Sequence, residues 1–354
     1  MSKIITFPHM GNYSYPVSYL LGHITTAEVR IAPKITERTI ELGTKYSPDF
    51  VCTPFKYTLG TFIEGLENGA NVLMQAGGGC RYGYYSELQE KILRDLNYEF
   101  DYYNLVSEGQ TKPKRIYHMM KEIEPKFSPI KGLYYLFITK KMVQYMDEFD
   151  NYIRERIGFE LEEGKYLNIL QEFLDSFKTV KNPFQLRRLY KKYYKKLKAV
   201  RIKKPDNCLK VGIIGELYTL MEPLANYDLE MTLAKYHIEV KRFTNVHYLM
   251  FEKSKEVPKY LEKAKKYIAY KMGADAADNI GRAKYLCEKG YDGIIHIKSS
   301  FCTPEIGAMP IIQKIANDYN VPVIFFSFDS GTSKVGIETR LEAFYDMLEM
   351  RKNI

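Results

Sequence analysis

The sequence predicts an α/β protein with two lobes, each built on a parallel sheet, and a helical insertion between them. Short apolar runs of strand length alternate with helical runs in the first third of the chain and again after residue 204. Such alternation is typical of parallel sheets, because each strand is followed by a crossover helix. Only helical patterns occur from residue 114 to residue 204. We therefore expect an N-terminal α/β lobe at 1–113, a helical subdomain at 114–204 and a C-terminal α/β lobe at 205–354.

The first lobe contains five strand-like runs and four helical runs. The expected strands are 3–7, 28–32, 50–52, 71–75 and 98–105, and the expected helices are 15–21, 34–45, 59–68 and 84–96. Gly69 and Asn97 mark the ends of two of these helices, because both residue types tolerate the left-handed backbone found at helix C-termini.

The second lobe repeats this alternation without repeating the sequence. Its expected strands are 209–214, 238–243, 293–297 and 321–328, and its closing helix is 337–350. We find no internal sequence repeat in the chain.

The composition is that of a soluble globular protein. The chain has 354 residues, of which 45% are hydrophobic and 27% charged, which suffices for two domains. No apolar run approaches the ~20 residues of a membrane helix, and no leader pattern is present. We expect a cytoplasmic protein without a membrane partner.

The net charge of +9 is concentrated in one segment. Residues 181–204 contain eleven Lys or Arg and no acid, which leaves the rest of the chain near −2. Apolar residues recur there at helical spacing, so we expect an amphipathic helix with a solvated basic face. Docking of an acidic protein or a phosphate-bearing ligand is an alternative. Nucleic-acid binding is a weaker alternative, because the rest of the surface is not basic.

Three of the five cysteines follow strand-like runs. Cys52, Cys80 and Cys302 each stand where such a run gives way to a loop before a helix. The carboxyl ends of parallel strands share one edge of the sheet, and ligands bind beyond that edge. The three thiolates can therefore converge on one metal between the lobes. Cys208 precedes a strand and Cys287 lies within a helical run, so neither fits this pattern.

The residues around these cysteines suit a bulky inorganic group. Gly77, Gly78 and Gly79 directly precede Cys80, and their lack of side chains lets the backbone approach such a group and direct N–H groups at it. Pro54 and Pro304 each follow a cysteine by two residues and fix the chain as it enters a helix.

Spacing alone leaves three interpretations open. The cysteines could be inert core residues, since unpaired cysteine is often buried. They could bind zinc, which takes four protein ligands or three and a water. They could also hold an iron–sulfur cluster, which usually takes four cysteines; a cubane held by three would leave one iron open to a substrate oxygen.

Four segments resemble a known family of iron–sulfur enzymes. They are the stretches Lys45–Lys56, Gln75–Tyr85, Val211–Glu216 and Gly336–Phe344. In this order they resemble the proteins related to 2-hydroxyacyl-CoA dehydratases and benzoyl-CoA reductases, most closely the stand-alone, activase-related branch. The resemblance spans essentially the whole chain.

The resemblance implies two Rossmann-like lobes with a [4Fe–4S] cluster between them, held by Cys52, Cys80 and Cys302. It implies a separate ATP-hydrolysing iron–sulfur activator protein that supplies low-potential electrons. It also implies an oxygen-sensitive reductase or radical dehydratase acting on a small substrate, in the family an acyl-CoA. We find no CoA-binding motif, and we expect a dimer. The alternative is a non-catalytic iron–sulfur carrier, sensor or assembly component. A double cubane would need more thiolates than these three.

Other polar residues are expected at the same sheet edge. His9 and Glu305 are candidate proton donors; the alternatives are a helix cap for His9 and a helix N-terminal acid for Glu305. Glu216 and Asn226 could face the cleft, although helix capping is the simpler role for both. Further candidates are Arg81 and Lys298, to offset cluster charge, and the loop 327–332, to cradle an anion.

Overall fold

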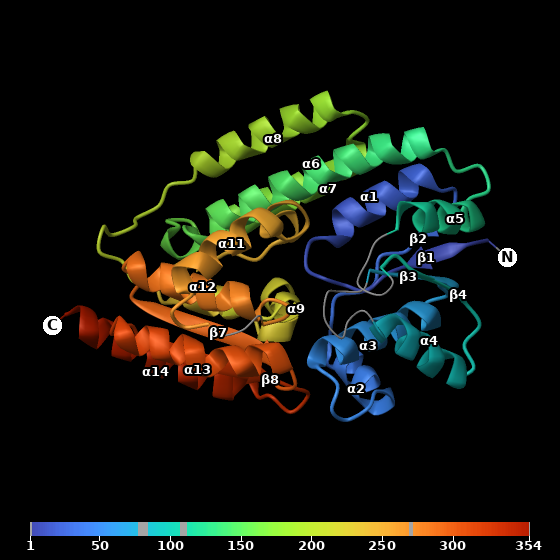
Figure 1. Cartoon of the computed structure of the whole chain (residues 1–354). Helices are drawn as coiled ribbons and strands as arrows, with labels where there is room; N and C mark the ends of the chain where they lie inside the picture. The colour runs from blue at the N-terminus through green and yellow to red at the C-terminus, as the bar shows by residue number, and fades with distance from the viewer. Residues whose placement is uncertain (1, 77–83, 107–111, 269–271, 354) are drawn as a thin grey trace. The chain divides into compact units, whose positions relative to one another are not determined.

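The computed structural model describes residues 2–76, 84–106, 112–268 and 272–353, and the chain forms two compact units (Figure 1). The first unit comprises Met1–Met142 and Phe177–Pro183, and the second comprises Val143–Ser176 and Phe184–Ile354. Each unit contains one four-stranded parallel sheet. The predicted α/β class with two Rossmann-like lobes is therefore confirmed. The boundaries predicted at residues 113 and 204 stay a prediction.

The sheet of the first unit has the order β2-β1-β3-β4. Its strands are β1 (Ile4–Thr6), β2 (Glu28–Val29), β3 (Val72–Gln75) and β4 (Asp101–Asn104). Its helices are α1 (Ser14–Ile24), α2 (Glu37–Tyr46), α3 (Thr53–Glu67), α4 (Tyr85–Asp95) and α5 (Pro113–Ile123). Four of the five predicted strands and all four predicted helices of this lobe are thus present. Gly69 and Asn97 have φ values of 85° and 62° just after α3 and α4, as expected for residues that end helices.

The predicted strand at 50–52 was wrong. Residues 47–52 form the turn between α2 and α3, in which the Val51 N–H donates to the Pro48 carbonyl at 3.4 Å. Phe50 is 78% exposed, so the run contributes little to a core. A three-residue run between two prolines is too short to pair as a strand, and Pro54 favours the start of a helix. Cys52 therefore follows a helix–helix turn and not a strand.

Two apolar clusters cover the two faces of the first sheet. Leu73 packs in one cluster with residues of α3 and α4, whereas Val72 and Met74 pack in the other with residues of α1 and α5. This division follows from the alternation of side chains along a strand. The first unit is therefore a three-layer α/β/α structure.

The sheet of the second unit has the order β6-β5-β7-β8. Its strands are β5 (Lys210–Gly215), β6 (Glu239–Arg242), β7 (Gly293–Ser299) and β8 (Val323–Phe328), at all four predicted positions. In both units the first strand therefore lies between the second and the third. Ligands of such open sheets bind beyond the carboxyl ends of the strands, where the order reverses. In the two units these points lie between β1 and β3 and between β5 and β7.

Helices complete the second unit and connect the two units. The helices are α6 (Pro129–Arg154), α7 (Lys165–Ser176), α8 (Pro183–Lys198), α9 (Leu217–Met221), α10 (Leu229–Lys235), α11 (Lys253–Ala264), α12 (Ala276–Glu288), α13 (Thr303–Asp318) and α14 (Lys334–Lys352). The unit boundary at Met142 falls inside α6. No helix in the described ranges is long and apolar enough to cross a membrane.

Helix α8 confirms the amphipathic helix predicted within residues 181–204. Leu186, Tyr193 and Leu197 are buried along one stripe. The Lys and Arg side chains of the helix are exposed, and Lys196 pairs with Glu172 at 2.5 Å. The basic residues therefore form a solvated face.

Candidate functional site

Cys52 occupies the N-cap position of α3. Its backbone is extended, with φ −68° and ψ 151°, and Pro54 lies in the first turn of the helix. Its Sγ lies 2.6 Å from the Tyr85 hydroxyl, at the first residue of α4. The aromatic ring of Tyr85 in turn packs edge-on against Phe55, with ring centroids 4.9 Å apart. These contacts hold the sulfur at the junction of two helix N-termini.

Close packing of α2 on α3 fixes the turn that carries Cys52. A Cβ on Gly43 would lie 1.8 Å from the Lys56 carbonyl oxygen, and a Cβ on Gly60 would lie 1.9 Å from that of Thr39. Both positions therefore require glycine for the two helices to approach. The Thr39 hydroxyl also donates to Glu64 at 2.7 Å. The turn at Cys52 is thus attached to a rigid helix pair.

Cys302 occupies the N-cap position of α13, three residues after β7 ends. Its N–H donates to the Ser299 carbonyl at 3.0 Å, and its own carbonyl accepts from the Ile306 N–H at 3.0 Å. Pro304 lies in the first turn of the helix. The prediction of a strand-end cysteine is confirmed at this position.

Cys52 and Cys302 therefore have the same local setting in different units. Each is half-buried and is followed by Thr-Pro and a helix. The N-terminal end of a helix carries partial positive charge and favours anions such as a thiolate. That these two sulfurs bind a metal stays a prediction.

The other cysteines divide into one outside the described residues and two that are buried. Cys80 lies outside the described residues, together with Gly77, Gly78, Gly79 and Arg81. Cys208 precedes β5 and Cys287 lies in α12, as predicted, and both are buried. Burial raises the pKa of the Cys208 thiol, and it raises the pKa of the Cys287 thiol to about 11. Both thiols thus resist ionisation.

Glu305 takes part in a buried polar network below Cys302. Its Oε2 lies 2.7 Å from His296 Nε2, and the Asn279 amide donates to both of its carboxylate oxygens at 3.0 Å. Asn279 also donates to the Gly215 carbonyl at 2.9 Å. All three side chains of this network are at most 1% exposed. Glu305 lies in the first turn of α13, so its predicted position as a helix N-terminal acid is confirmed.

Gly215 allows β5 to end directly beside β7. Its φ is 145°, and a Cβ there would lie 1.8 Å from the Ile297 carbonyl oxygen. Only glycine fits this approach. The network of Asn279, Glu305 and His296 therefore contacts the end of β5 and strand β7, the two strands between which the strand order reverses.

Lys298 is a buried cation close to Cys302. Its side chain is on β7, and its Nζ lies 3.4 Å from the carbonyl oxygens of Ser299 and Ser300. Burial lowers the pKa of Lys298, whereas the nearby Cys302 and Glu305 act to raise it. The predicted charge-offsetting residue is therefore next to one of the predicted ligands.

Glu216 has the predicted capping role, whereas Asn226 bonds to the first residue of a helix whose N-cap is Asp228. Glu216 is the N-cap of α9 and accepts from the Tyr218 and Thr219 N–H groups at 2.9 and 3.0 Å. Asn226 accepts from the Leu229 N–H at the start of α10, at 3.2 Å.

His9 lies buried between β1 and α1, beyond the carboxyl end of β1. It does not cap α1, because the N-cap is Tyr13, so that alternative was wrong. Its role as a proton donor stays a prediction.

The loop after β8 uses its small donors internally. The Asp329 carboxylate accepts from the Gly331 N–H at 2.9 Å, the Thr332 hydroxyl at 3.2 Å and the Ser300 hydroxyl at 3.0 Å. An anion held by these donors would have to displace Asp329. The loop therefore gives no support to the predicted anion cradle.

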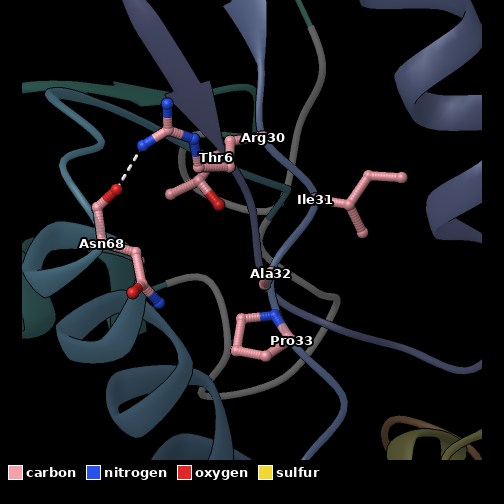
Figure 2. A pocket seen from close by; sticks show the side chains of 7 residues that line it. Thr6, Arg30, Ile31, Ala32, Pro33 and Asn68 are labelled. Carbon is pink, nitrogen blue, oxygen red and sulfur yellow. Dashed lines mark hydrogen bonds between the residues drawn. The ribbon is translucent and has the colours of Figure 1, made fainter.

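A cavity of about 350 Å³ lies in the first unit, between β1, the segment after β2 and the end of α3. Figure 2 shows Arg30 donating to the backbone oxygen of Asn68 at its side. Arg30 is also paired with Glu28 at 2.6 Å. Gly65, which lines the cavity, is thirteen residues along α3 from Cys52, roughly 20 Å at the helical rise. This cavity is therefore separate from the cysteine site.

Three residues that the sequence pattern did not single out belong to these sites. Tyr85 contacts Cys52, and His296 and Asn279 bind Glu305. In residues 2–76, 84–106, 112–268 and 272–353, no group of three or more His, Cys, Asp or Glu could hold a metal ion. The predicted convergence of three thiolates includes Cys80, so it stays a prediction.

The chain matches the model of a known protein family. The model described as "2-hydroxyglutaryl-CoA dehydratase, D-component" matches residues 15–348. A search of curated proteins found no match. Because the matched segment covers nearly the whole chain, including all five cysteines, the chain belongs to the family of 2-hydroxyglutaryl-CoA dehydratase D-components.

Proposed function

We propose that the chain is a [4Fe–4S] protein that receives low-potential electrons from an ATP-hydrolysing activator and reduces or dehydrates a small substrate. The family is a dehydratase component that works with an ATP-dependent activator. We take the substrate to be an acyl-CoA ester, by membership of that family. Cys52, Cys80 and Cys302 would hold the cluster.

The observation that carries this proposal is the shared setting of Cys52 and Cys302. Each cysteine occupies the N-cap position of a helix that begins Thr-Pro, at the carboxyl edge of a sheet with the same strand order. Buried structural cysteines have no reason to share such a setting, and Cys208 and Cys287 do not have it. The donor set therefore fits a thiolate-bound cluster, with Cys80 as the third ligand.

The surroundings of the two sulfurs also suit a cluster. Tyr85 Oη lies 2.6 Å from Cys52 Sγ, and hydrogen bonds to ligand sulfur are a means of tuning cluster potential. Lys298 places a positive charge near Cys302. Both residues would stabilise the negative charge of metal-bound thiolates.

The cluster and the residues around it would have different roles in the reaction. When bound, the cluster would supply single low-potential electrons to the substrate. Lys298 would favour the more negatively charged, reduced state. The network of His296, Glu305 and Asn279 would hold the N-terminus of α13, and with it Cys302, in position. His9, beyond β1, would be the candidate proton donor.

An anaerobic reduction experiment tests the proposal. The full chain, purified without oxygen, is mixed with a reduced activator of this family and either ATP or ADP, and the reduced cluster is followed by electron paramagnetic resonance. We expect a reduced-cluster signal with ATP only. A change of the signal on addition of 2-hydroxyacyl-CoA would support an enzyme. A cluster indifferent both to ATP and to acyl-CoA would instead support a carrier, and a chain that binds no iron would overturn both.

A further inference from the structure

Helix α4 lies against α3 (Figure 1), and a buried glutamine attaches it to the first turn of that helix. The Gln89 amide nitrogen donates to the Phe55 carbonyl at 3.1 Å and to the Thr58 hydroxyl at 2.7 Å. The Thr58 hydroxyl in turn donates to the Pro54 carbonyl at 2.9 Å. A carbonyl oxygen can only accept, so Gln89 must present its NH2 group to α3. These bonds therefore end in the first turn of the helix that follows Cys52.

Stability alone does not explain a glutamine at position 89. The side chain of Gln89 is fully buried, and its Oε1 has no hydrogen-bond partner in the part of the chain that the structure describes. An unpartnered buried oxygen is unfavourable, and a methionine of similar length would fill the same space without it. We therefore expect the two bonds from the amide nitrogen to serve the site beside them.

Gln89 and Tyr85 lie one helical turn apart on the same face of α4. Residues four apart on a helix are neighbours, and both of these side chains reach the beginning of α3. The Tyr85 hydroxyl lies 2.6 Å from Cys52 Sγ. A thiolate cannot donate, so with Cys52 ionised the Tyr85 hydroxyl is the donor of this hydrogen bond. One face of α4 thus holds both the donor to the sulfur and the amide that anchors the helix.

The bonds of Gln89 restrict rotation of α4 about its own axis. A rotation by about 10° would displace a side-chain atom about 6 Å from the axis by roughly 1 Å. Hydrogen-bond distances vary by much less than that, so such a rotation would weaken the bond from Tyr85 to Cys52. It would also break the bonds from Gln89 to α3. The position of the Tyr85 hydroxyl relative to the sulfur therefore depends on Gln89.

A second buried contact attaches the start of α4 to the sheet. The Asn104 amide, at the end of β4, donates to the Ser86 hydroxyl at 2.5 Å, and both side chains are buried. Asn104 also accepts from the Val106 N–H at 3.1 Å. Because Ser86 is next to Tyr85, this contact limits movement of α4 along the sheet, whereas Gln89 limits its rotation against α3.

We infer that Gln89 is a positioning residue that sets the reduction potential of the cluster through the hydrogen bond from Tyr85 to Cys52. This inference rests on the proposed function, because it concerns the cluster that Cys52 would hold. A hydrogen bond to a ligand sulfur stabilises the more negative, reduced cluster and so raises the potential. Without Gln89, the Tyr85 hydroxyl moves away from the sulfur and the reduced state loses that stabilisation.

Anaerobic redox titration of the reconstituted full chain, followed by electron paramagnetic resonance, tests the inference. The variants are Tyr85→Phe, Gln89→Met and the double variant, beside Lys91→Met as the matched control. Lys91→Met introduces the same side chain on the same helix, but the Lys91 side chain is 70% exposed. The iron content and the thermal melting of each sample show whether it carries the cluster and is folded.

We expect Tyr85→Phe to shift the one-electron equilibrium about tenfold toward the oxidised cluster, which corresponds to about 59 mV. Gln89→Met should shift it about threefold in the same direction, and Lys91→Met should leave it unchanged. The double variant should equal Tyr85→Phe, because Gln89 acts through the Tyr85 hydroxyl. A cluster-loaded Gln89→Met protein with the wild-type potential would overturn the inference while the proposed function stands. Additive shifts in the double variant would do the same.

Substitution of Thr58 tests the inference if Gln89→Met does not fold. Thr58→Val removes the hydroxyl that accepts from Gln89 with little change of shape, whereas Thr58→Ser keeps that hydroxyl. Thr58→Val should lower the potential by part of the shift expected for Gln89→Met, and Thr58→Ser should leave it unchanged. Equal potentials in the two folded Thr58 variants would contradict the inference. A wild-type chain that binds no iron would instead overturn the proposed function, and the inference with it.

Discussion

His296 Nε2 lies 2.7 Å from Glu305 Oε2, and neither side chain is exposed to solvent by more than 1%. This contact joins β7 to the first turn of α13, three residues after Cys302. Asn279 adds α12 and the end of β5 to the same network. The position of Cys302 is therefore determined by buried polar contacts as well as by the helix that it caps.

Removal of the Glu305 carboxylate should destabilise the second unit. Glu305→Ala leaves the buried donors of Asn279 and His296 without their acceptor, which costs about 3 kcal/mol. Glu305→Gln keeps one acceptor oxygen and should cost less. Urea unfolding measures both, with Glu342→Ala on the exposed face of α14 as control. Equal stability of Glu305→Ala and the control would contradict the structural role of the network.

Stability should fall in acid because of Glu230. Burial acts to raise the pKa of Glu230, but Arg154 and Arg242, bonded to it at 2.8 Å, outweigh burial and hold the pKa below 4.5. An acid whose pKa is lowered in the folded state stabilises the fold above its unfolded pKa, and that contribution is lost as the pH falls through the folded value.

The measurement is the unfolding free energy at about pH 6 and about pH 4, for the wild type and Glu230→Gln. We expect the variant to be less stable by about 2 kcal/mol at the higher pH, because two buried guanidiniums lose the charge of their carboxylate partner. Its loss of stability on acidification should be smaller than that of the wild type. A variant with the same acid dependence as the wild type would refute this assignment.

Thiol labelling should separate the cysteines into two classes. After chelation of iron, iodoacetamide at about pH 8 should modify Cys52 and Cys302 well before Cys208 and Cys287, as followed by peptide mass spectrometry. A pKa of about 11 for Cys287 leaves on the order of one thiol in a thousand ionised at that pH. In denaturant all four should react. Labelling of native Cys287 as fast as Cys302 would show that its helix does not bury it.

Neutralising Lys298 should lower the reduction potential of the bound cluster. Loss of a buried positive charge beside Cys302 disfavours addition of an electron, so we expect Lys298→Met to shift the potential by roughly −50 mV, close to a tenfold change in a one-electron equilibrium. An anaerobic redox titration measures this shift. The exposed substitution Lys334→Met serves as control, and a potential shared by all three proteins would contradict the role given to Lys298.

The sheets could be predicted because their strands are strongly patterned. All seven residues of β7 are buried, and its three isoleucines mark a strand-like run ahead of Cys302 in the sequence. The run at Phe50 failed because three apolar residues between prolines carry no periodicity. The common strand order of the two units could not be read from sequence, since no repeat accompanies it. The tripeptide Cys-Thr-Pro does recur, at the N-terminal ends of α3 and α13.

The candidate site was only partly predictable for the same physical reason. Cysteines before helices are visible in sequence, because capping and proline are local signals. Tyr85 and Asn279 reach Cys52 and Glu305 only through tertiary packing, across 33 and 26 residues. His296 lies between isoleucines in the strand-like run of β7, where nothing in the sequence marks its contact with Glu305. Local pattern therefore indicates the candidate ligands but not the residues that contact or position them.

The most direct test of the central claim is the iron and acid-labile sulfide content of anaerobically reconstituted protein, in the wild type and in single Cys→Ser variants. We predict about four iron and four sulfide per chain for the wild type, Cys208→Ser and Cys287→Ser. Cys52→Ser, Cys80→Ser and Cys302→Ser should each lose most of both. Full cluster content in any of these three variants, or none in the wild type, would contradict the claim that these thiolates hold one cluster.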